Sequence, residues 1–530
     1  MYVYKLRHRA PDQHRECDMT RFHGLSRRGF LRNAGALGLI AATPLPAFAQ
    51  DAPKRGGTLA IGIEGGSTGD SLDPRTFNSP YWGVVSGTIF NTLVEIHGPS
   101  NELRPGLAKS WEGSEGGRRW VFDLVEGATF HDGRPVTAAD VIHSLRIHDA
   151  DDSRSNSRAI AASIAGATAE GPARVIFDLH EANYFFPAML SNYPLCIIPD
   201  GTTIFDGIGT GPYRITRFSP GEVIEAVRHD GYFKPDSAWV DQVVILVAND
   251  PAARASAFQS GQLHIASMLE SRTAALLGAL PGKQLLPYQG AQFTGFNLRA
   301  DIAPFDNADL RMALKLAIDR EDVLARVYGG MGRIGNDTPI PPNDPLFAAD
   351  IPQNGYDPEK AAALFRKSGF SGTLTLRTSE AASAAAVDMS ALFREHAARA
   401  GIDFEVVREP ADGFWTNVWG QAPFHSTLWG ARPTADMILT TAYSTGSPGN
   451  DTHWSNPAFD AAIAAARGEA DEAKRRDHYV EAQRLLSSDG GVIIPVFGDV
   501  IEGLSTDVQG YVSGTQPLAN YRAAEQVWLA

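Results

Sequence analysis

Few residues of this chain are spaced for catalysis. Gly65–Gly69 reads Gly-Gly-Ser-Thr-Gly and matches the G-x-S-x-G pattern of serine hydrolases. In those enzymes the serine is the nucleophile, and a helix must follow it directly to present its hydroxyl group on a sharp turn. Here Asp70–Pro74 follows, and this segment has the composition of a loop. His131 stands beside Asp132, and adjacent positions project in different directions, which favours a structural role over a metal or acid–base pair. We expect no catalytic residue, no metal and no cofactor, and a hydrolase remains the remote alternative.

Composition excludes several classes of partner. The 530 residues include 47 Lys and Arg against 61 Asp and Glu, a net charge of −14. Nucleic acids and anionic membranes both require a basic face, so neither is expected as a partner. With 43% hydrophobic and 20% charged residues the chain is globular. Its length predicts two to four sub-structures of ~100 to 200 residues each.

Residues 1–49 are typical of an export signal. Arg27 and Arg28 precede an apolar run over 34–42 and then the small-residue site Ala47–Ala49. The arginine pair predicts export by the twin-arginine translocase, with cleavage after Ala49 and release into a periplasm. This segment holds eight Lys and Arg and three Asp and Glu, so the mature chain keeps 39 basic and 58 acidic residues, a net charge of −19.

The chain has two cysteines, Cys17 and Cys196. Cys17 lies in the predicted leader, so the mature protein cannot form an intramolecular disulfide. No cysteine follows the apolar run, so we expect no lipid anchor. Whether translation starts at Met1 or Met19 stays open.

The stretch 209–233 carries the clearest hairpin signal. Alternating residues in Pro212–Phe218 and Glu222–Arg228 flank the turn Ser219–Gly221 and predict two antiparallel strands. The flexible Gly209–Pro212 predicts a point where the chain passes from one sub-structure into another. An ordinary surface hairpin is the alternative.

Further on, helix signals alternate with strand signals, which indicates an α/β fold. Capping residues predict helices from Asp319 to Gly329, from Asp357 to Gly369 and from Asn456 to Gly468. A helical stripe before Gly401 is followed by a predicted strand over Ile402–Val406. The stripe consists of Met389, Leu392, Phe393, His396 and Ala397. Thr137 and Asp140 resemble a capping box at the start of another helix.

Five segments, in this order, resemble the family 5 extracellular solute-binding proteins, the periplasmic oligopeptide, dipeptide and nickel receptors of ABC importers. They read LRPGLAKSWE, WVFDLVEGATFHDGRPVTAADVIHSL, GTGPYRITRFSPGE, VDQVVILVANDPAARASAFQSGQLHIA and PFDNADLRMALKLAIDREDVL. The resemblance runs from about Gly56 to Val508. It implies a two-lobed periplasmic binding protein of type II, cluster C, that closes over its ligand, with an extra domain inserted in the first lobe.

The resemblance also implies boundaries for these parts. Lobe I comprises 50–89, 206–298 and 499–530, the inserted domain 90–205 and lobe II 299–498. The chain is expected to return to lobe I near Ile493–Phe497. The implied partners are a peptide or peptide-like ligand and the permease subunits with their ATPases. We expect a monomer, and signalling to a chemoreceptor stays open.

In peptide-binding relatives an Asp shortly after a Trp of the second lobe holds the ligand's ammonium group. Here Arg432 stands about there, three residues after Trp429. A guanidinium group repels ammonium but pairs with a carboxylate through two hydrogen bonds. A carboxylate-bearing ligand such as an opine or a metal chelate is therefore the alternative to a peptide. Asp436 is the alternative ammonium partner, and Arg432 could instead form a structural salt bridge.

The resemblance brings further residues to the ligand. Asn78, Tyr81 and Trp82 fall in the ligand loop of the first lobe, and Phe293 falls in the hinge strand. Trp415 and Trp419 precede Trp429, and aromatic rings offer rigid faces to a ligand. The predicted ligand-binding residues are Arg432, Trp429, Asp436, Tyr81, Trp82, Asn78, Phe293 and Trp415.

Overall fold

The computed structural model describes residues 2–3, 52–151, 153, 155–432 and 434–530. The predicted leader therefore lies almost wholly outside the described residues. The exception is β1 (Tyr2–Val3), which pairs antiparallel with β5 (Ala108–Ser114). None of the helices in the described ranges has the length and apolar character needed to span a membrane.

A seven-stranded sheet forms the first lobe, in the order β13-β20-β12-β2-β11-β10-β9. Its strands are β2 (Thr58–Ile63), β9 (Tyr213–Ser219), β10 (Val223–Arg228), β11 (Gln242–Val247), β12 (Ile265–Ala266), β13 (Lys283–Tyr288) and β20 (Val500–Ser505). The predicted hairpin is confirmed, because β9 and β10 pair antiparallel from Val223 opposite Ser219 to Arg228 opposite Tyr213. Helices α5 (Pro251–Gln259) and α6 (Ser271–Gly278) pack near its other end.

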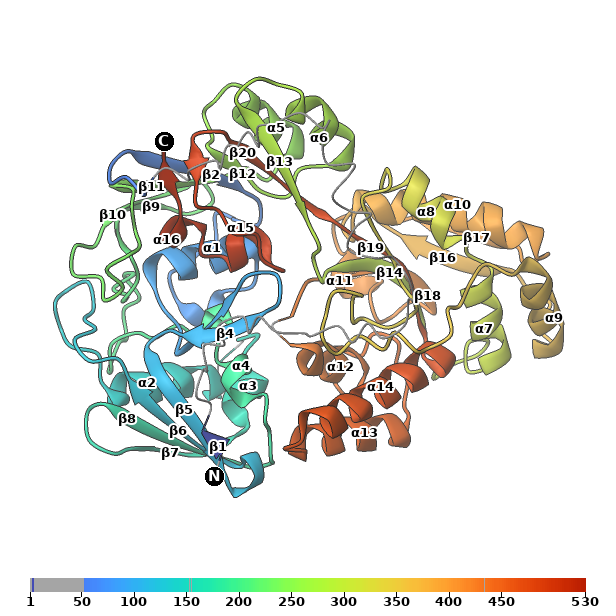
Figure 1. The fold of residues 1–530 in the computed structure, drawn as a ribbon. Helices are drawn as coiled ribbons and strands as arrows, with labels where there is room; N and C mark the ends of the chain where they lie inside the picture. The colour runs from blue at the N-terminus through green and yellow to red at the C-terminus, as the bar shows by residue number, and fades with distance from the viewer. Residues whose placement is uncertain (1, 4–51, 152, 154, 433) are drawn as a thin grey trace, which may run out of the picture. The chain divides into compact units, whose positions relative to one another are not determined.

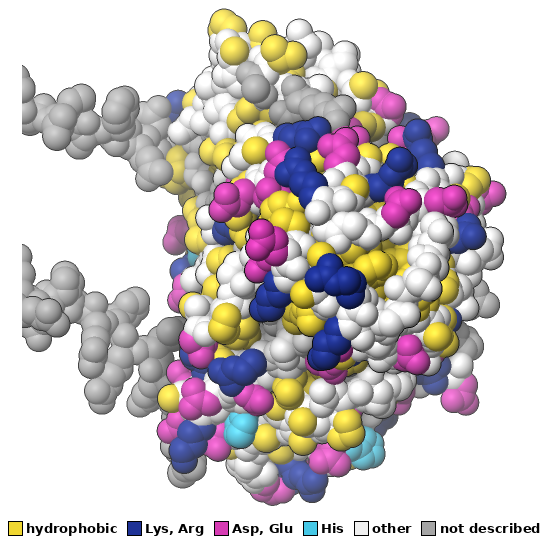
Figure 2. Space-filling view, turned by 90° about the vertical axis from the view of Figure 1, so that its right-hand side faces the viewer, with side chains coloured by type: hydrophobic (Ala, Val, Ile, Leu, Met, Phe, Trp, Pro, Cys, Tyr) yellow, Lys and Arg dark blue, Asp and Glu magenta, His cyan; other side chains and the backbone are white. Residues whose placement is uncertain are grey.

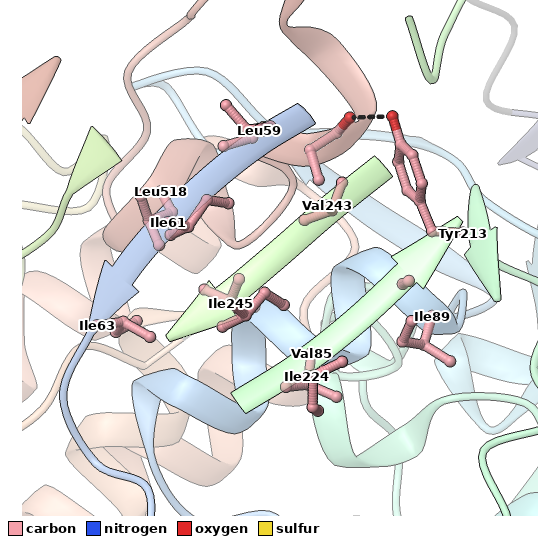
Figure 3. Packing of buried hydrophobic residues seen from close by; sticks show 14 of the residues in the cluster. Leu59, Ile61, Ile63, Val85, Ile89, Tyr213, Ile224, Val243, Ile245 and Leu518 are labelled. Carbon is pink, nitrogen blue, oxygen red and sulfur yellow. Dashed lines mark hydrogen bonds between the residues drawn. The ribbon is translucent and has the colours of Figure 1, made fainter. Parts of the chain in front are cut away.

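The core of this lobe lies between the sheet and α1 (Pro80–Ile89). Figure 3 shows Leu59, Ile61 and Ile63 of β2 beside Val243 and Ile245 of β11, with α1 next to them. The Tyr213 hydroxyl donates to the Ala524 and Val240 carbonyls. The first strand of the hairpin is thereby tied to the C-terminal segment.

A five-stranded sheet, in the order β1-β5-β6-β8-β7, is formed by the predicted inserted segment together with β1. It contains β6 (Arg119–Leu124), β7 (Ile164–Ala169) and β8 (Arg174–Leu179). Helices α2 (Ala138–Arg146), α3 (Arg158–Ala162) and α4 (Phe186–Met189) accompany it, and β3 (Val94–His97) pairs with β4 (Glu102–Pro105). The capping box of α2 is present as predicted.

The Gly209–Pro212 stretch leads from this part of the chain into β9. His131 holds it, because the Gly209 N–H donates to Nδ1 at 3.2 Å and Nε2 lies 3.1 Å from the Gly211 carbonyl oxygen. Burial lowers the pKa of His131 to about 4, so the ring is neutral. Its role is structural, because its two nitrogens bind the backbone of Gly209 and Gly211. The Gly211 N–H donates to the Ile89 carbonyl at the end of α1.

A six-stranded sheet forms the second lobe, in the order β15-β19-β14-β18-β16-β17. Its strands are β14 (Phe293–Leu298), β15 (Gly332–Ile334), β16 (Leu374–Thr378), β17 (Phe404–Arg408), β18 (Phe424–Trp429) and β19 (Val492–Gly498). The strand β14 belongs to this sheet, although its residues precede the expected start of lobe II at 299. The tertiary pairing with β18 and β19 decides this, because a buried strand can join either neighbouring sheet.

The helices of the second lobe follow the capping signals closely. Asp357 and Asn456 cap α9 (Pro358–Ser368) and α13 (Pro457–Gly468), and Gly369 ends α9 at φ 73°. Asp319 caps α8, which stops at Arg326, three residues before the predicted end. The remaining helices are α7 (Ala308–Leu316), α8 (Arg320–Arg326), α10 (Ala384–Arg399), α11 (Phe414–Asn417), α12 (Ala435–Tyr443) and α14 (Glu472–Asp489). In Figure 1, α13 and α14 run side by side.

Two short connections join the sheets of the two lobes, from β13 to β14 and from β19 to β20. Arg333 of β15 holds both, because its guanidinium group donates to Asp499 Oδ1 at 2.8 Å and to the Gly290 carbonyl at 3.2 Å. The predicted return point, Ile493–Phe497, lies inside β19 of the second-lobe sheet, and the chain passes to the first-lobe sheet just after it, at Asp499. The chain ends with β21 (Val508–Gln509), α15 (Pro517–Asn520), α16 (Ala523–Gln526) and β22 (Trp528–Leu529).

The tight crossing at Gly209 gives a first prediction. A Cβ atom on Gly209 would lie 2.1 Å from the Ile89 carbonyl oxygen, which is backbone and cannot move freely. Gly209→Ala should therefore lower the free energy of unfolding by about 2 kcal/mol or more, measured by urea denaturation. The matched control is Gly355→Ala, because a Cβ there meets nothing within 4 Å. Equal stability of the two variants would contradict a steric requirement at the crossing.

Candidate functional site

A cavity of about 490 Å³ lies beside the two connections between the lobes. Tyr288, Gly290 and Val500 line it from the connections and their flanking strands. Asn78, predicted as a ligand contact, lines it from the segment before α1. This volume is within the range of small-molecule sites.

Three tryptophans form an aromatic wall of this cavity. Trp415, Trp419 and Trp429 all line it, and their rings lie 6.0 Å and 6.2 Å apart in succession. The indole Nε1 of Trp419 and that of Trp429 donate to the same oxygen, Asp451 Oδ2, at 2.9 and 3.0 Å. Thr427 Oγ1 donates to that oxygen as well. One buried carboxylate thus fixes the orientation of two rings.

The environment of Asp451 explains its altered acidity. The side chain is only 2% exposed, and burial raises its pKa to about 6 despite its hydrogen bonds from Trp429, Thr427 and Trp419. Sequence reasoning missed this residue because it follows no motif. A signal could have come only from knowing that Trp419 and Trp429 converge.

Arg432 is the charged group of the site. Its Nη1 atom donates to the Gly430 and Ala431 carbonyls at 3.1 and 3.4 Å, and the guanidinium carbon lies 5.3 Å from the Trp429 ring centre. Among the described residues no carboxylate lies within ion-pair distance of Arg432. Burial lowers its pKa from the ordinary value of an arginine. Arg432 therefore does not form, with any described residue, the structural salt bridge that the sequence left open as an alternative.

Tyr193 and Tyr521 line the same cavity, and sequence reasoning missed both. Their rings meet edge to face with centres 5.4 Å apart. Tyr193 lies in a short 3-10 helix (Tyr193–Leu195), and Tyr521 closes a left-handed turn at φ 68°. Such a turn of non-glycine residues has no sequence signature, because tertiary contacts impose it.

Four predicted residues do not line the cavity. Asp436 is fully buried and bound by the Arg467 guanidinium group and the Tyr479 hydroxyl, with oxygen contacts from 2.7 to 3.1 Å. Its carboxylate is neutralised by the ion pair with Arg467. Asp436 is therefore not placed to bind an ammonium group of a ligand, as the sequence analysis had allowed. Phe293 is buried in β14 against Phe497.

Tyr81 and Trp82 are the other two residues outside the cavity lining. Both are buried in α1, where Trp82 stacks on Phe77 with ring centres 4.4 Å apart. The loop that leads into α1 does reach the cavity through Asn78, Ser79 and Pro80. The predicted segment is therefore in place, but the helix turns its aromatic residues into the core of the first lobe. Of the eight predicted residues, the cavity brings together Arg432, Trp429, Asn78 and Trp415.

The shared acceptor at Asp451 generates a prediction. Asp451→Ala should lower the free energy of unfolding by about 2 to 4 kcal/mol, because Trp419, Trp429 and Thr427 lose the acceptor that they share. Tryptophan fluorescence should shift as Trp419 and Trp429 lose their fixed orientation, whereas Asp451→Asn should recover part of both properties because it keeps one acceptor oxygen. Asp477→Ala on the exposed face of α14 is the control. Unchanged fluorescence in Asp451→Ala would contradict the proposed orientation of the rings.

Comparisons with known proteins identify the family of this chain. The family described as "Bacterial extracellular solute-binding proteins, family 5 Middle" matches residues 102–451, more than half of the chain. The dipeptide-binding protein of Pseudomonas aeruginosa is 25% identical over 93% of this chain and 98% of its own length.

Solved structures share the fold. AgaA of A. tumefaciens R10 in complex with agropinic acid has a TM-score of 0.77 at 22% identity, covering 89% of this chain and 99% of its own. The periplasmic binding protein DppA of Helicobacter pylori in complex with the peptide STSA has the same TM-score and identity, covering 90% and 98%. Both have the two-lobed architecture expected from the sequence. On the family match, this chain is a member of the bacterial extracellular solute-binding proteins, family 5.

Proposed function

We propose that this protein is the periplasmic substrate-binding component of an ABC importer. It captures a peptide or peptide-like small molecule between its two lobes and delivers it to the permease subunits and their ATPases. Membership of family 5 supports the class of protein, and the cavity beside the connections of the two lobes supports the mode of capture. The face in Figure 2 intersperses Lys and Arg with Asp and Glu, so it offers no continuous basic surface for a nucleic acid.

The observation that carries the ligand assignment is Arg432. Of the described residues that line the cavity, it is the one with a charged side chain, and its guanidinium group donates to backbone carbonyls of its own loop. A guanidinium group retains further donors in this arrangement. We propose that it receives a carboxylate of the ligand by a two-pronged, charge-assisted contact.

Two classes of ligand are consistent with such a contact. A peptide offers its C-terminal carboxylate, and the relative from Pseudomonas aeruginosa is named a dipeptide-binding protein. A carboxylate-bearing non-peptide such as an opine or a metal chelate offers the same group, and the AgaA structure contains agropinic acid. The contact at Arg432 is common to both classes.

Exchange of Arg432 tests this proposal. Leaving a ligand carboxylate unpaired in a closed cleft costs roughly 2 to 5 kcal/mol. Arg432→Ala should therefore weaken binding of the natural ligand by about 30-fold or more, and Arg432→Lys should recover only part of the affinity, because it lacks the planar pair of donors. Calorimetry with the ligand that co-purifies with the protein provides the measurement. Equal affinities of the wild type and both variants would remove Arg432 from the site.

Export generates a separate test. We propose that the leader of residues 1–49 directs the folded chain through the twin-arginine translocase and is removed after Ala49, without a lipid anchor; these residues lie almost wholly outside the described part of the chain. Replacing Arg27 and Arg28 by Lys keeps the charge but removes the recognised pair. The mature form should then disappear from the periplasmic fraction on immunoblots. Normal export of the variant would contradict the twin-arginine assignment.

A further inference from the structure

We infer that the ligand is a monocarboxylate without a free ammonium group, and that its carboxylate is shared by the Arg432 guanidinium group and the phenol hydroxyls of Tyr193 and Tyr521. This inference rests on the proposed function, because it assumes that the cavity of about 490 Å³ is the ligand site. It adds the chemical class of the ligand and two residues that recognise it.

The first argument is the charge of the cavity wall. Besides Arg432, the polar side chains that the described residues contribute are neutral, with five carboxamides from Asn78, Asn156, Asn192, Gln292 and Gln516. An ammonium group taken out of water needs a carboxylate to offset its desolvation. No described residue of the lining supplies one, and Arg432 repels a second cation.

Two acids of neighbouring elements cannot take this role in the arrangement described. Asp436 is fully buried, with its oxygens held by Arg467 and Tyr479. Asp451 is buried, and its Oδ2 atom already receives three hydrogen bonds. A rotation of Asp451 toward a ligand would break the hydrogen bonds that orient two indoles of the wall, and a rotation of Asp436 would break its buried ion pair with Arg467.

The second argument is the setting of Arg432. Tyr193 and Tyr521 line the cavity with it, and the guanidinium charge is close enough to favour the ionised form of both phenols against the effect of burial. Neither phenol oxygen has a hydrogen-bond partner among the described residues. A phenol hydroxyl donates readily to a carboxylate, so the lining of this cavity offers three groups that can donate to one anion.

These donors come from different parts of the chain. Arg432 belongs to the loop between β18 and α12 of the second lobe, whereas Tyr521 packs on Gly83 and Gly87 of α1 in the first lobe. A carboxylate held by both would connect the lobes. The neutral amides and the tryptophan rings suit the rest of such a ligand, namely amide or hydroxyl groups on a carbon skeleton with apolar faces.

Matched pairs of acids test the ligand class by calorimetry on the mature protein freed of bound ligand. The first pair is L-alanyl-L-tyrosine and its N-acetyl derivative, and the second is D-glucosaminate and D-gluconate. Within at least one pair the compound without ammonium should bind at least tenfold more tightly than its partner, and its carboxamide analogue should lose binding. The inference would be overturned if, in each pair with measurable binding, the compound with the ammonium group bound as tightly as its partner or more tightly.

The outcomes also separate this inference from the proposed function. Preference for the ammonium compounds with a continued loss of affinity in Arg432→Ala would overturn the inference alone. Unchanged affinity in Arg432→Ala would remove the carboxylate contact and with it the inference, whereas the assignment as an importer component rests on the family match and would stand. A wild type that binds no member of either pair would overturn the inference and leave the family-based assignment in place.

Single-atom variants test the two phenols. Tyr193→Phe and Tyr521→Phe should each weaken binding of the preferred acid by about three- to tenfold and leave the melting temperature of the unliganded protein unchanged. Tyr356→Phe is the matched control, since its hydroxyl donates to the His396 carbonyl in the second lobe. Affinities of both cavity variants equal to that of Tyr356→Phe would overturn the role of the phenols.

Discussion

The position of the cavity between the two lobes depends on the hydrogen bonds of the Arg333 guanidinium group. This group binds Asp499 and the Gly290 carbonyl, and so it holds together the two connections between the lobes. Gly290 itself lines the cavity, and Val500 follows Asp499 directly. A change at this contact would therefore alter both the connections between the lobes and the wall of the cavity. Its burial requires charge compensation, which Asp499 provides.

A second constraint is the desolvation cost of the two buried carboxylates, Asp436 and Asp451, near the cavity that Arg432 lines. Asp436 is neutralised by Arg467, whereas Asp451 has no cationic partner among the described residues and relies on indole and hydroxyl donors. Because these donors are neutral, burial raises the pKa of Asp451. Asp436 is thus held away from the cavity and Asp451 orients two of its indoles, and Arg432 is the charged side chain that the described residues present to the cavity.

The C-terminal segment stores strain beside the cavity. Leu518, Ala519, Asn520 and Tyr521 have φ values of 53°, 57°, 55° and 68°, a left-handed turn that costs roughly 1 to 2 kcal/mol per residue. The buried Glu502 carboxylate accepts a hydrogen bond from the Leu518 N–H. The Asn520 side-chain oxygen accepts hydrogen bonds from the N–H groups of Thr515 and Gln516. These contacts hold Tyr521 at the cavity wall, which an ordinary helical turn would not do.

The sequence by itself determined the α/β class, the hairpin at 213–228, the caps of the helices at Asp357 and Asn456, and the presence of a cation after Trp429. Each depends on local chemistry, since a turn, a cap or a side-chain charge acts within a few residues. The tertiary structure alone decided that Asp436 pairs with Arg467, that α1 buries Tyr81 and Trp82, and that Tyr193 and Tyr521 line one cavity with Arg432. These outcomes depend on contacts between residues far apart in the chain, whose free energies no local pattern records.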